Sequence, residues 1–177
     1  MRLFIAIKIP EDIKEYISEL QKQIDTANNK ISLVNKDNIH LTLKFLGEVQ
    51  PNDIETIKES LNNVKFKSFS VHLNDVDVFP NENYIRVIWI GLEPEENILE
   101  LQKNIDESLK SLFRKEKDFK PHLTLARVKY IEDKNNFINK LKNIKIENKK
   151  IDISNFRLVK STLTPEGPVY EDLEVFK

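Results

Sequence analysis

The sequence predicts an α+β protein with two pseudo-symmetric lobes around a central cleft, formed by an internal duplication. One observation is that the tetrapeptide His-Leu-Thr-Leu occurs twice, at residues 40–43 and 122–125. A given histidine is followed by Leu-Thr-Leu by chance on the order of once in a thousand cases. A second observation is that the order of strands and helices around residue 40 recurs 82 residues later, around residue 122. Both observations favour duplication over coincidence.

The first half of the chain predicts strand, helix, strand, helix, strand. Pro10, Glu11 and Asp12 suit the first turn of a helix, and Asn28 suits its end. Pro51 suits the start of the second helix, whose apolar residues recur at helical spacing. The expected elements are a strand at 2–9, a helix from 10 to 27, the first His-Leu-Thr-Leu strand at 39–47, a helix from 51 to 64 and a strand at 69–79.

The second half repeats this order and adds a strand. No flexible linker divides the chain, so we expect residues 1–177 to form a single domain whose two lobes do not fold independently. The expected elements are a strand at 84–90, a helix from 93 to 112, the second His-Leu-Thr-Leu strand at 122–128, a helix around 137–141, a strand at about 151–160, a turn at 164–168 and a strand at 169–176.

Composition excludes several classes of function. The chain has 28 Lys and Arg, 29 Asp and Glu and a net charge of -1, so a polyanion must be recognised by a local cluster of cations. The absence of cysteine excludes disulfides, thiolate zinc sites and cysteine nucleophiles. The three glycines are too far apart for a phosphate-binding loop or a nucleophile elbow. Pro10 ends the N-terminal apolar run early, so we expect a cytoplasmic protein with no membrane partner.

The repeated tetrapeptides predict a polar face on two strands. Side chains alternate along a strand, so His40 and Thr42 share one face while the two leucines point to the core. The same holds for His122 and Thr124. If the two strands meet at a cleft, two imidazoles and two hydroxyls surround one small volume.

Two histidines in one cleft suit general acid and base catalysis, because imidazole exchanges protons near neutral pH. Two alternatives use the same residues. A metal site would need a third ligand, but neither a His-Glu-x-x-His nor a His-x-His pattern is present, so we expect no metal. A binding module without catalysis remains the other alternative. The third histidine, His72, has no threonine partner and is interpreted as structural.

These motifs, with their flanks, resemble the two-histidine (2H) phosphoesterase superfamily, and more narrowly the RNA 2',3'-cyclic phosphodiesterases long called 2'-5' RNA ligases. The resemblance covers nearly the whole chain. One departure is that relatives often carry a tryptophan before the first motif, where this chain has residues 31–34, Ile-Ser-Leu-Val. The matching segments are Arg2–Ile7, Asn38–Val49, Arg86–Trp89, Pro121–Arg127 and Ser161–Leu163 with Tyr170.

The resemblance implies a fold, a reaction and roles for the motif residues. The fold is two lobes of antiparallel sheet with outer helices and a central groove. The reaction is hydrolysis of a 2',3'-cyclic phosphate at an RNA 3' end to a 2'-phosphate, without a cofactor or metal. His40 would be the proton donor, His122 the proton acceptor, and Thr42 and Thr124 would hold the phosphate. The alternatives are 2'-5' RNA ligation, a small cyclic nucleotide as substrate, or an RNA-end-binding module, and we expect a monomer.

Three further residues are candidates for substrate binding. Arg127 closes the second motif, but strict alternation puts it on the face opposite His122, so reaching the cleft requires twist, a bulge or its long stem. The other interpretation of Arg127 is a surface ion pair. Phe45 and Tyr84 could stack on a base, although Phe45 also suits the core. Lys44 shares the face of His40 by alternation and is interpreted as a solvated lysine at a strand end.

Overall fold

Every strand pairing in the computed structural model, which describes residues 1–177, is antiparallel. Nine strands form one sheet in the order β7-β4-β5-β6-β3-β1-β8-β9, with β2 paired to β6. The strands are β1 (Arg2–Lys8), β2 (Lys30–Leu33), β3 (His40–Glu48), β4 (Phe69–Asn81), β5 (Tyr84–Glu93), β6 (His122–Tyr130), β7 (Lys150–Ile153), β8 (Phe156–Thr164) and β9 (Gly167–Phe176).

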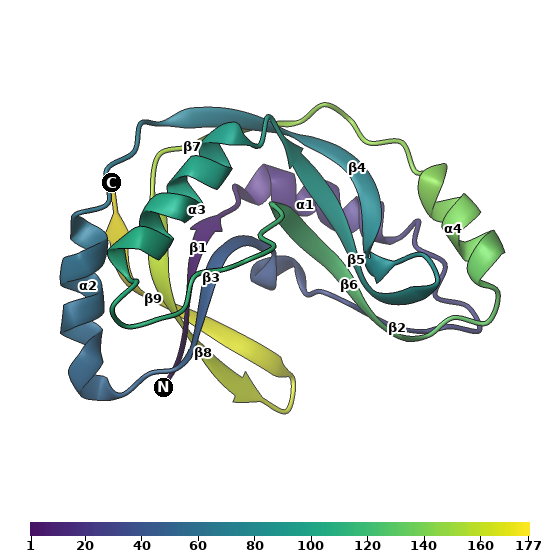
Figure 1. Ribbon diagram of the computed structural model, residues 1–177. Coiled ribbons are helices and arrows are strands. Elements are labelled where there is room, and N and C mark those ends of the chain that lie inside the picture. Colours follow the sequence, from purple (N-terminus) through teal and green to yellow (C-terminus); the bar gives the residue numbers. More distant parts are fainter.

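Four α-helices flank the sheet, and the expected α+β class is confirmed. In Figure 1, α2 and α3 lie near β9 and β3, whereas α4 lies at the opposite end of the molecule near β4. None of the helices is long and apolar enough to cross a membrane. The α-helices are α1 (Glu11–Gln21), α2 (Ile54–Asn62), α3 (Glu96–Ser108) and α4 (Lys134–Lys142), and short 3-10 turns lie at Lys36–Asn38 and Pro51–Asp53.

The sheet divides into two lobes at its centre. The strands β3 and β6 are joined there by one pair of facing residues, Leu41 and Leu123. One lobe contains β3, β1, β8 and β9, and the other contains β6, β5, β4, β7 and β2. The expected pair of lobes is therefore confirmed, and the first residues of β3 and β6 lie at the boundary between them.

Each lobe takes elements from both halves of the chain. The strand β4 belongs to the first repeat in sequence but pairs with β5 of the second, and β8, near the C-terminus, pairs with β1 at the N-terminus. Helices are exchanged in the same way, because α1 packs against β6 and α3 packs against β3. Neither half of the chain contains a complete lobe.

We propose, from this exchange, that the two lobes form one folding unit, and we predict a single cooperative unfolding transition. Separating the halves would leave β1 without β8 and β4 without β5, exposing core on both pieces. Urea unfolding followed by the fluorescence of Trp89 and by far-ultraviolet circular dichroism should give coincident curves. Two resolved transitions, or a stable fold in a fragment of residues 1–82, would contradict the proposal.

The duplication is visible in the burial of the two motif strands. The strands β3 and β6 both have nine residues, and their side chains follow the same sequence of buried, half-buried and exposed positions. Leu41 and Leu123 are fully buried, as are the second leucines of each motif, within a core of 40 apolar residues. The leucine face of each motif therefore anchors its strand in the core, as expected.

Four features of the structure differ from the expected elements. The single strand expected at 151–160 is two strands, because Ser154 and Asn155 interrupt it where the chain passes from β4 in one lobe to β1 in the other. The strand β2 was not expected, since it is short and mostly exposed, and it lies on the edge of β6. The first helix ends at Gln21 rather than at 27 and the third ends at Ser108 rather than at 112, while the expected turn before Gly167 is confirmed.

Candidate active site

The four motif side chains converge where the two lobes meet. His40 and Thr42 are half-buried on one face of β3, and His122 and Thr124 are half-buried on the same face of β6. Because Leu41 lies opposite Leu123 in an antiparallel pair, this register sets Thr124 across from His40 and Thr42 across from His122. The two imidazoles therefore lie diagonally across one strand boundary, each next to a threonine of the other motif.

Backbone carbonyls fix the orientation of both imidazoles. His40 Nδ1 lies 2.6 Å from the carbonyl oxygen of Asn38, and His122 Nδ1 lies 2.7 Å from that of Lys120. A carbonyl oxygen can only accept a hydrogen bond, so Nδ1 of each ring carries the proton and donates it. The proton that can be exchanged is then at Nε2 of both rings, as the chemistry of a general acid and base requires.

Aromatic rings pack around each histidine. The ring of His40 lies 4.9 Å from that of Phe4 and 5.2 Å from that of Tyr170, measured between centroids. The ring of His122 lies 5.0 Å from that of Phe79 and 5.9 Å from that of Trp89. These contacts hold the two imidazoles in place and remove them partly from water.

The surroundings lower the pKa of both histidines. Burial lowers the pKa of His40 to about 4, and the charges of Lys14, His122 and Arg127 act in the same direction, although the hydrogen bond to Asn38 opposes them. Burial also lowers the pKa of His122, with a further contribution from Arg127 and opposition from the carbonyl of Lys120. Both imidazoles are therefore neutral at pH 7 in the free protein.

A β-bulge interrupts each motif strand at the second leucine. In β3, Thr42 faces Ala6, but the next residue paired with β1 is Lys44, so Leu43 has no facing residue. In β6, Thr124 faces Trp89 and the next residue paired with β5 is Ala126, so Leu125 is the extra residue. An extra residue reverses the alternation of the positions that follow it. Consequently Phe45 and Arg127 lie on the face of the histidines.

Arg127 lies on the face of the histidines because of this bulge, which was one of the three routes open to it. The side chain is exposed and forms no ion pair, so its interpretation as a surface ion pair is wrong. Its charge acts on the pKa of His40, of His122 and of Tyr170. The guanidinium therefore lies close to both motifs and is free to bind an anion.

Because of the bulge in β3, Lys44 and Phe45 lie on the faces opposite to those that strict alternation predicts. Phe45 is 67% exposed and packs at 6.1 Å from Phe4, so it lies on the cleft side rather than in the core. Lys44 is 2% exposed on the opposite face, where Nζ donates to Asp106 Oδ1 at 2.5 Å. The interpretation of Lys44 as a solvated lysine is wrong, because strict alternation does not continue past Leu43.

Tyr84 and His72 lie away from the two motifs. Tyr84 begins β5, seven residues before Gly91, the residue that faces His122. At about 3.3 Å per residue, the two positions are about 23 Å apart along the strand. His72 lies on β4 between Glu93 and Lys150 of the neighbouring strands. The structure thus gathers the motif residues, Arg127 and Phe45, and leaves these two outside.

Gln21 supports the bulge of β6, which nothing in the sequence indicated. Its buried amide donates to the carbonyl oxygens of Leu125 at 2.7 Å and Val34 at 2.9 Å. The backbone N–H of Val34 donates to the same Leu125 oxygen at 2.9 Å. Because Leu125 is the extra residue, these bonds hold the backbone conformation that turns Arg127 toward the cleft.

We predict that Gln21→Met will weaken this support with little change in volume. Of the two hydrogen bonds that Gln21 donates, the one to Leu125 supports the bulge, and its net loss is worth about 0.5–1.5 kcal/mol, so binding of a phosphate by Arg127 should weaken by up to about tenfold. Steady-state kinetics should show a lowered kcat/KM. Gln23→Met on the exposed side of the same segment is the control, and an equal effect of both changes would contradict this role.

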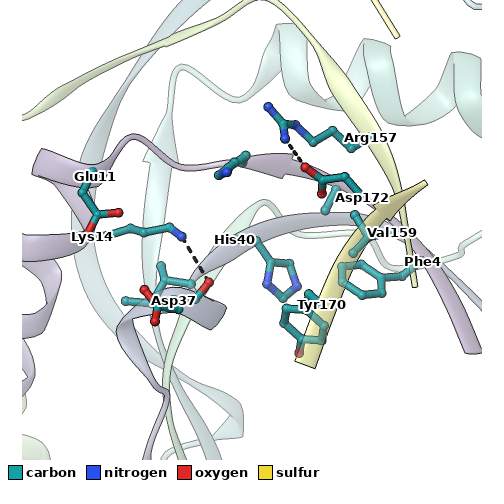
Figure 2. Close-up of a pocket in the computed structure, with 12 residues that line it drawn as sticks. Phe4, Glu11, Lys14, Asp37, His40, Arg157, Val159, Tyr170 and Asp172 are labelled. Atoms are coloured by element: carbon teal, nitrogen blue, oxygen red, sulfur yellow. Dashed lines mark hydrogen bonds and ion pairs between the residues drawn. The ribbon is translucent and has the colours of Figure 1, made fainter. Parts of the chain in front are cut away.

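A pocket of about 320 Å³ adjoins His40 in the lobe of β1, β8 and β9. Figure 2 shows His40 between Tyr170 and Phe4 on one side and Lys14 on the other. The buried Lys14 donates through Nζ to the carbonyl oxygen of Asp37 at 3.1 Å, while Arg157 pairs with Asp172. Nowhere in the chain do three or more His, Cys, Asp or Glu side chains form a group that could hold a metal ion.

Comparison with protein families and curated relatives gives one consistent result. The family model described as LigT like Phosphoesterase matches the chain twice, at residues 7–89 and 90–170, in agreement with the duplication. A protein of Methanocaldococcus jannaschii named RNA 2',3'-cyclic phosphodiesterase is 45% identical over 174 residues, or 97% of each chain. A protein of Archaeoglobus fulgidus with the same name is 37% identical over 179 residues, which cover both chains completely.

Solved structures share the fold over nearly their whole length. The protein TT0787 of Thermus thermophilus superposes with a TM-score of 0.82 and 29% identity, covering 99% of this chain and 97% of its own. Escherichia coli LigT in complex with 3'-AMP superposes with a TM-score of 0.80 and 25% identity, covering 99% and 96%. The two-lobed sheet described above is therefore an architecture that these proteins have in common.

Proposed function

This chain belongs to the LigT like phosphoesterase family, and from that membership and the geometry of its site we propose that it hydrolyses a 2',3'-cyclic phosphate at the 3' end of RNA to a 2'-phosphate. The observation that carries the proposal is the paired arrangement of two imidazoles, both with Nδ1 bonded to a backbone carbonyl and Nε2 free for proton transfer. The relatives named RNA 2',3'-cyclic phosphodiesterase support the choice of substrate.

The proposed mechanism uses both histidines. Nε2 of His122 takes a proton from water as the water oxygen attacks phosphorus. Nε2 of protonated His40 gives its proton to the 3' oxygen as the bond from phosphorus to that oxygen breaks. The products are a 2'-phosphate and a free 3'-hydroxyl, and the two histidines have exchanged protonation states. Each proton transfer is commonly worth about 10²- to 10⁴-fold in rate.

The remaining side chains stabilise the phosphate in this proposal. The hydroxyls of Thr42 and Thr124 donate to the non-bridging oxygens, whose negative charge rises in the transition state. The guanidinium of Arg127 supplies the positive charge that a metal ion would otherwise provide, and its planar donors match two phosphate oxygens. Phe45 offers an exposed aromatic face on which a base can stack.

The test is incubation with an oligoribonucleotide that ends in a 2',3'-cyclic phosphate, in the presence of EDTA. We expect a 2'-phosphate end, formed at the same rate with and without divalent metal. A 3'-phosphate product would contradict the assigned leaving group, and turnover that requires added metal would contradict the metal-free mechanism. Hydrolysis of cyclic mononucleotides alone would move the assignment to a small-molecule substrate.

We predict a bell-shaped pH dependence whose position differs between kcat/KM and kcat. Catalysis needs one charged and one neutral histidine, and burial lowers the pKa of both His40 and His122. In the free protein the singly protonated pair therefore forms only in acid, so kcat/KM should peak below pH 6.5 and fall as the pH rises. A bound phosphate anion favours the imidazolium, so kcat should peak at a higher pH. A profile that stays flat from about pH 5 to 8 would contradict both roles.

A monomeric state and a cytoplasmic location are also part of the proposal. The cleft is complete within one chain, since both motifs and Arg127 come from the same molecule. Light scattering after size-exclusion chromatography should give a mass close to the 20.8 kDa of the chain. The location can be measured by cell fractionation, and recovery with the membranes would contradict it.

A further inference from the structure

A strip of unpaired positive charge leads away from the catalytic cleft on the lobe of β6. We call it the basic strip and define it by four cations, Arg127, Lys129, Arg86 and Lys30, and two tyrosines, Tyr84 and Tyr130. All six side chains are exposed. The strip begins at Arg127, on the face of the histidines, and follows β6, together with the neighbouring strands β5 and β2, for about 10 Å.

Strand register places these residues next to one another. Arg127 faces Val87 of β5 on one side and Ser32 of β2 on the other. Tyr130 faces Lys30, two residues before Ser32, and Ile31 between them packs against the core. Lys30 and Ser32 therefore point to the face of Arg127.

Arg86 connects β5 to the same strip. Its guanidinium donates to the carbonyl oxygen of Lys129 at 3.3 Å and lies 4.3 Å from the centre of the Tyr84 ring. It also donates to the hydroxyl of Tyr84. Arg86 and Tyr84 are therefore in contact with each other beside β6. Tyr84, which lies far from the histidines, is thus part of the basic strip.

None of the four cations is neutralised by a carboxylate. They form no ion pair, whereas Lys140 and Lys142 on α4 of the same lobe are paired with Asp25 and Glu82. The acidic residues Asp77 on β4 and Glu132 after β6 also form no ion pair with the strip. In a chain whose net charge is -1, these free cations form the kind of local cluster that a polyanion needs.

We propose that the basic strip binds the single-stranded RNA chain that precedes the terminal cyclic phosphate. Cations that follow the backbone, combined with exposed aromatic rings that stack on bases, are the general means of binding single-stranded nucleic acid without sequence preference. The strip starts where the cyclic phosphate binds and continues outward, so it gives the enzyme affinity for RNA over a mononucleotide. The proposal rests on the proposed function, because it assumes that the RNA ends in a cyclic phosphate bound at the two histidines.

The test compares the variant K30Q/K129Q with the wild type on two substrates. Neither lysine side chain forms a hydrogen bond or an ion pair, so the variant should fold normally. Because each phosphate contact in single-stranded nucleic acid contributes about 0.7 to the slope of log affinity against log salt, the slope for an oligoribonucleotide should fall by about 1.4. KM for the oligonucleotide at low salt should rise about tenfold or more, while kcat/KM for a 2',3'-cyclic mononucleotide stays unchanged.

The matched control is K65Q/K67Q, which removes two exposed, unpaired lysines beside α3 outside the cleft. The proposal would be overturned if both variants had equal effects, or if K30Q/K129Q affected both substrates equally. It would also be overturned if K30Q/K129Q changed only the ligation of the RNA to a second strand that carries a 5'-hydroxyl. Fluorescence anisotropy with a labelled oligoribonucleotide measures RNA affinity without turnover. If the wild-type protein binds RNA without hydrolysing the cyclic phosphate, and K30Q/K129Q still weakens that binding, the proposed reaction is wrong but the role of the basic strip in RNA binding holds.

Discussion

Replacement of His40 or His122 with Ala is expected to lower kcat/KM for an RNA 2',3'-cyclic phosphate by about 10²- to 10⁴-fold, because each change removes one proton transfer. The double variant should lose little more than the worse single variant, since the two histidines act in one concerted step and such residues are not additive. Single-turnover rates, measured with enzyme in saturating excess over substrate, would separate the chemical step from product release.

Packing around the histidines provides the control for this prediction. Each imidazole contacts two aromatic rings, so an alanine leaves a cavity and some loss of stability. The melting temperature should therefore be measured beside the rate, and Thr124→Val should reduce the rate by much less than His122→Ala. Activity within tenfold of wild type in a folded His122 variant would show that another group is the base.

Much of the fold could be predicted because the sequence repeats itself. Duplication located the two motif strands, and alternation placed their leucines in the core, as the full burial of Leu41 and Leu123 confirms. The starts of helices followed from proline and acidic residues, such as Pro10 with Glu11 before α1. These signals are local, so each can be recognised without knowing what lies nearby in space.

Features that depend on contacts between distant segments could not be predicted. The bulge at Leu125 changes the face of every later residue, but only the pairing with β5 and the amide of Gln21 reveal it. Hydrophobic periodicity does not reveal where the chain passes from one lobe to the other. One continuous strand was therefore expected at 151–160, where the structure has β7 in one lobe and β8 in the other. The two bulges shape the site, because Arg127 shares the face of the histidines only after the shift at Leu125, and Phe45 only after the one at Leu43.

The expected result with the largest effect on stability concerns Asp106. Asp106→Ala should lower the free energy of unfolding by about 3–5 kcal/mol, because it leaves the buried Lys44 ammonium without a counter-charge. The pair is almost completely buried, with side-chain exposures of 2% and 6%, and the atoms are 2.5 Å apart. In a domain of this size that loss corresponds to a fall of roughly 6–20 °C in melting temperature.

The network around Asp106 makes the prediction asymmetric. Its carboxylate also accepts from Gln102 at 2.8 Å and from the backbone N–H of Glu116 at 2.9 Å, so Lys44→Met leaves it with two donors. Lys44, in contrast, would keep only the carbonyl oxygen of Arg114 at 2.7 Å. Asp106→Ala should therefore lower the free energy of unfolding more than Lys44→Met does. Urea unfolding of the two single variants measures the difference, and equal losses would contradict it.

The double variant K44M/D106L separates the cost of an unpaired charge from the value of the pair itself. Replacing both partners by apolar side chains of similar size is often close to neutral, so the double variant should recover much of the stability that Asp106→Ala loses. Activity should recover less than stability, because Asp106 also holds Glu116 in the segment that leads into His122. A double variant that matched wild type in stability and rate would show that this network only fills the core. A double variant that is stable but slow would show that Asp106 also positions the second motif.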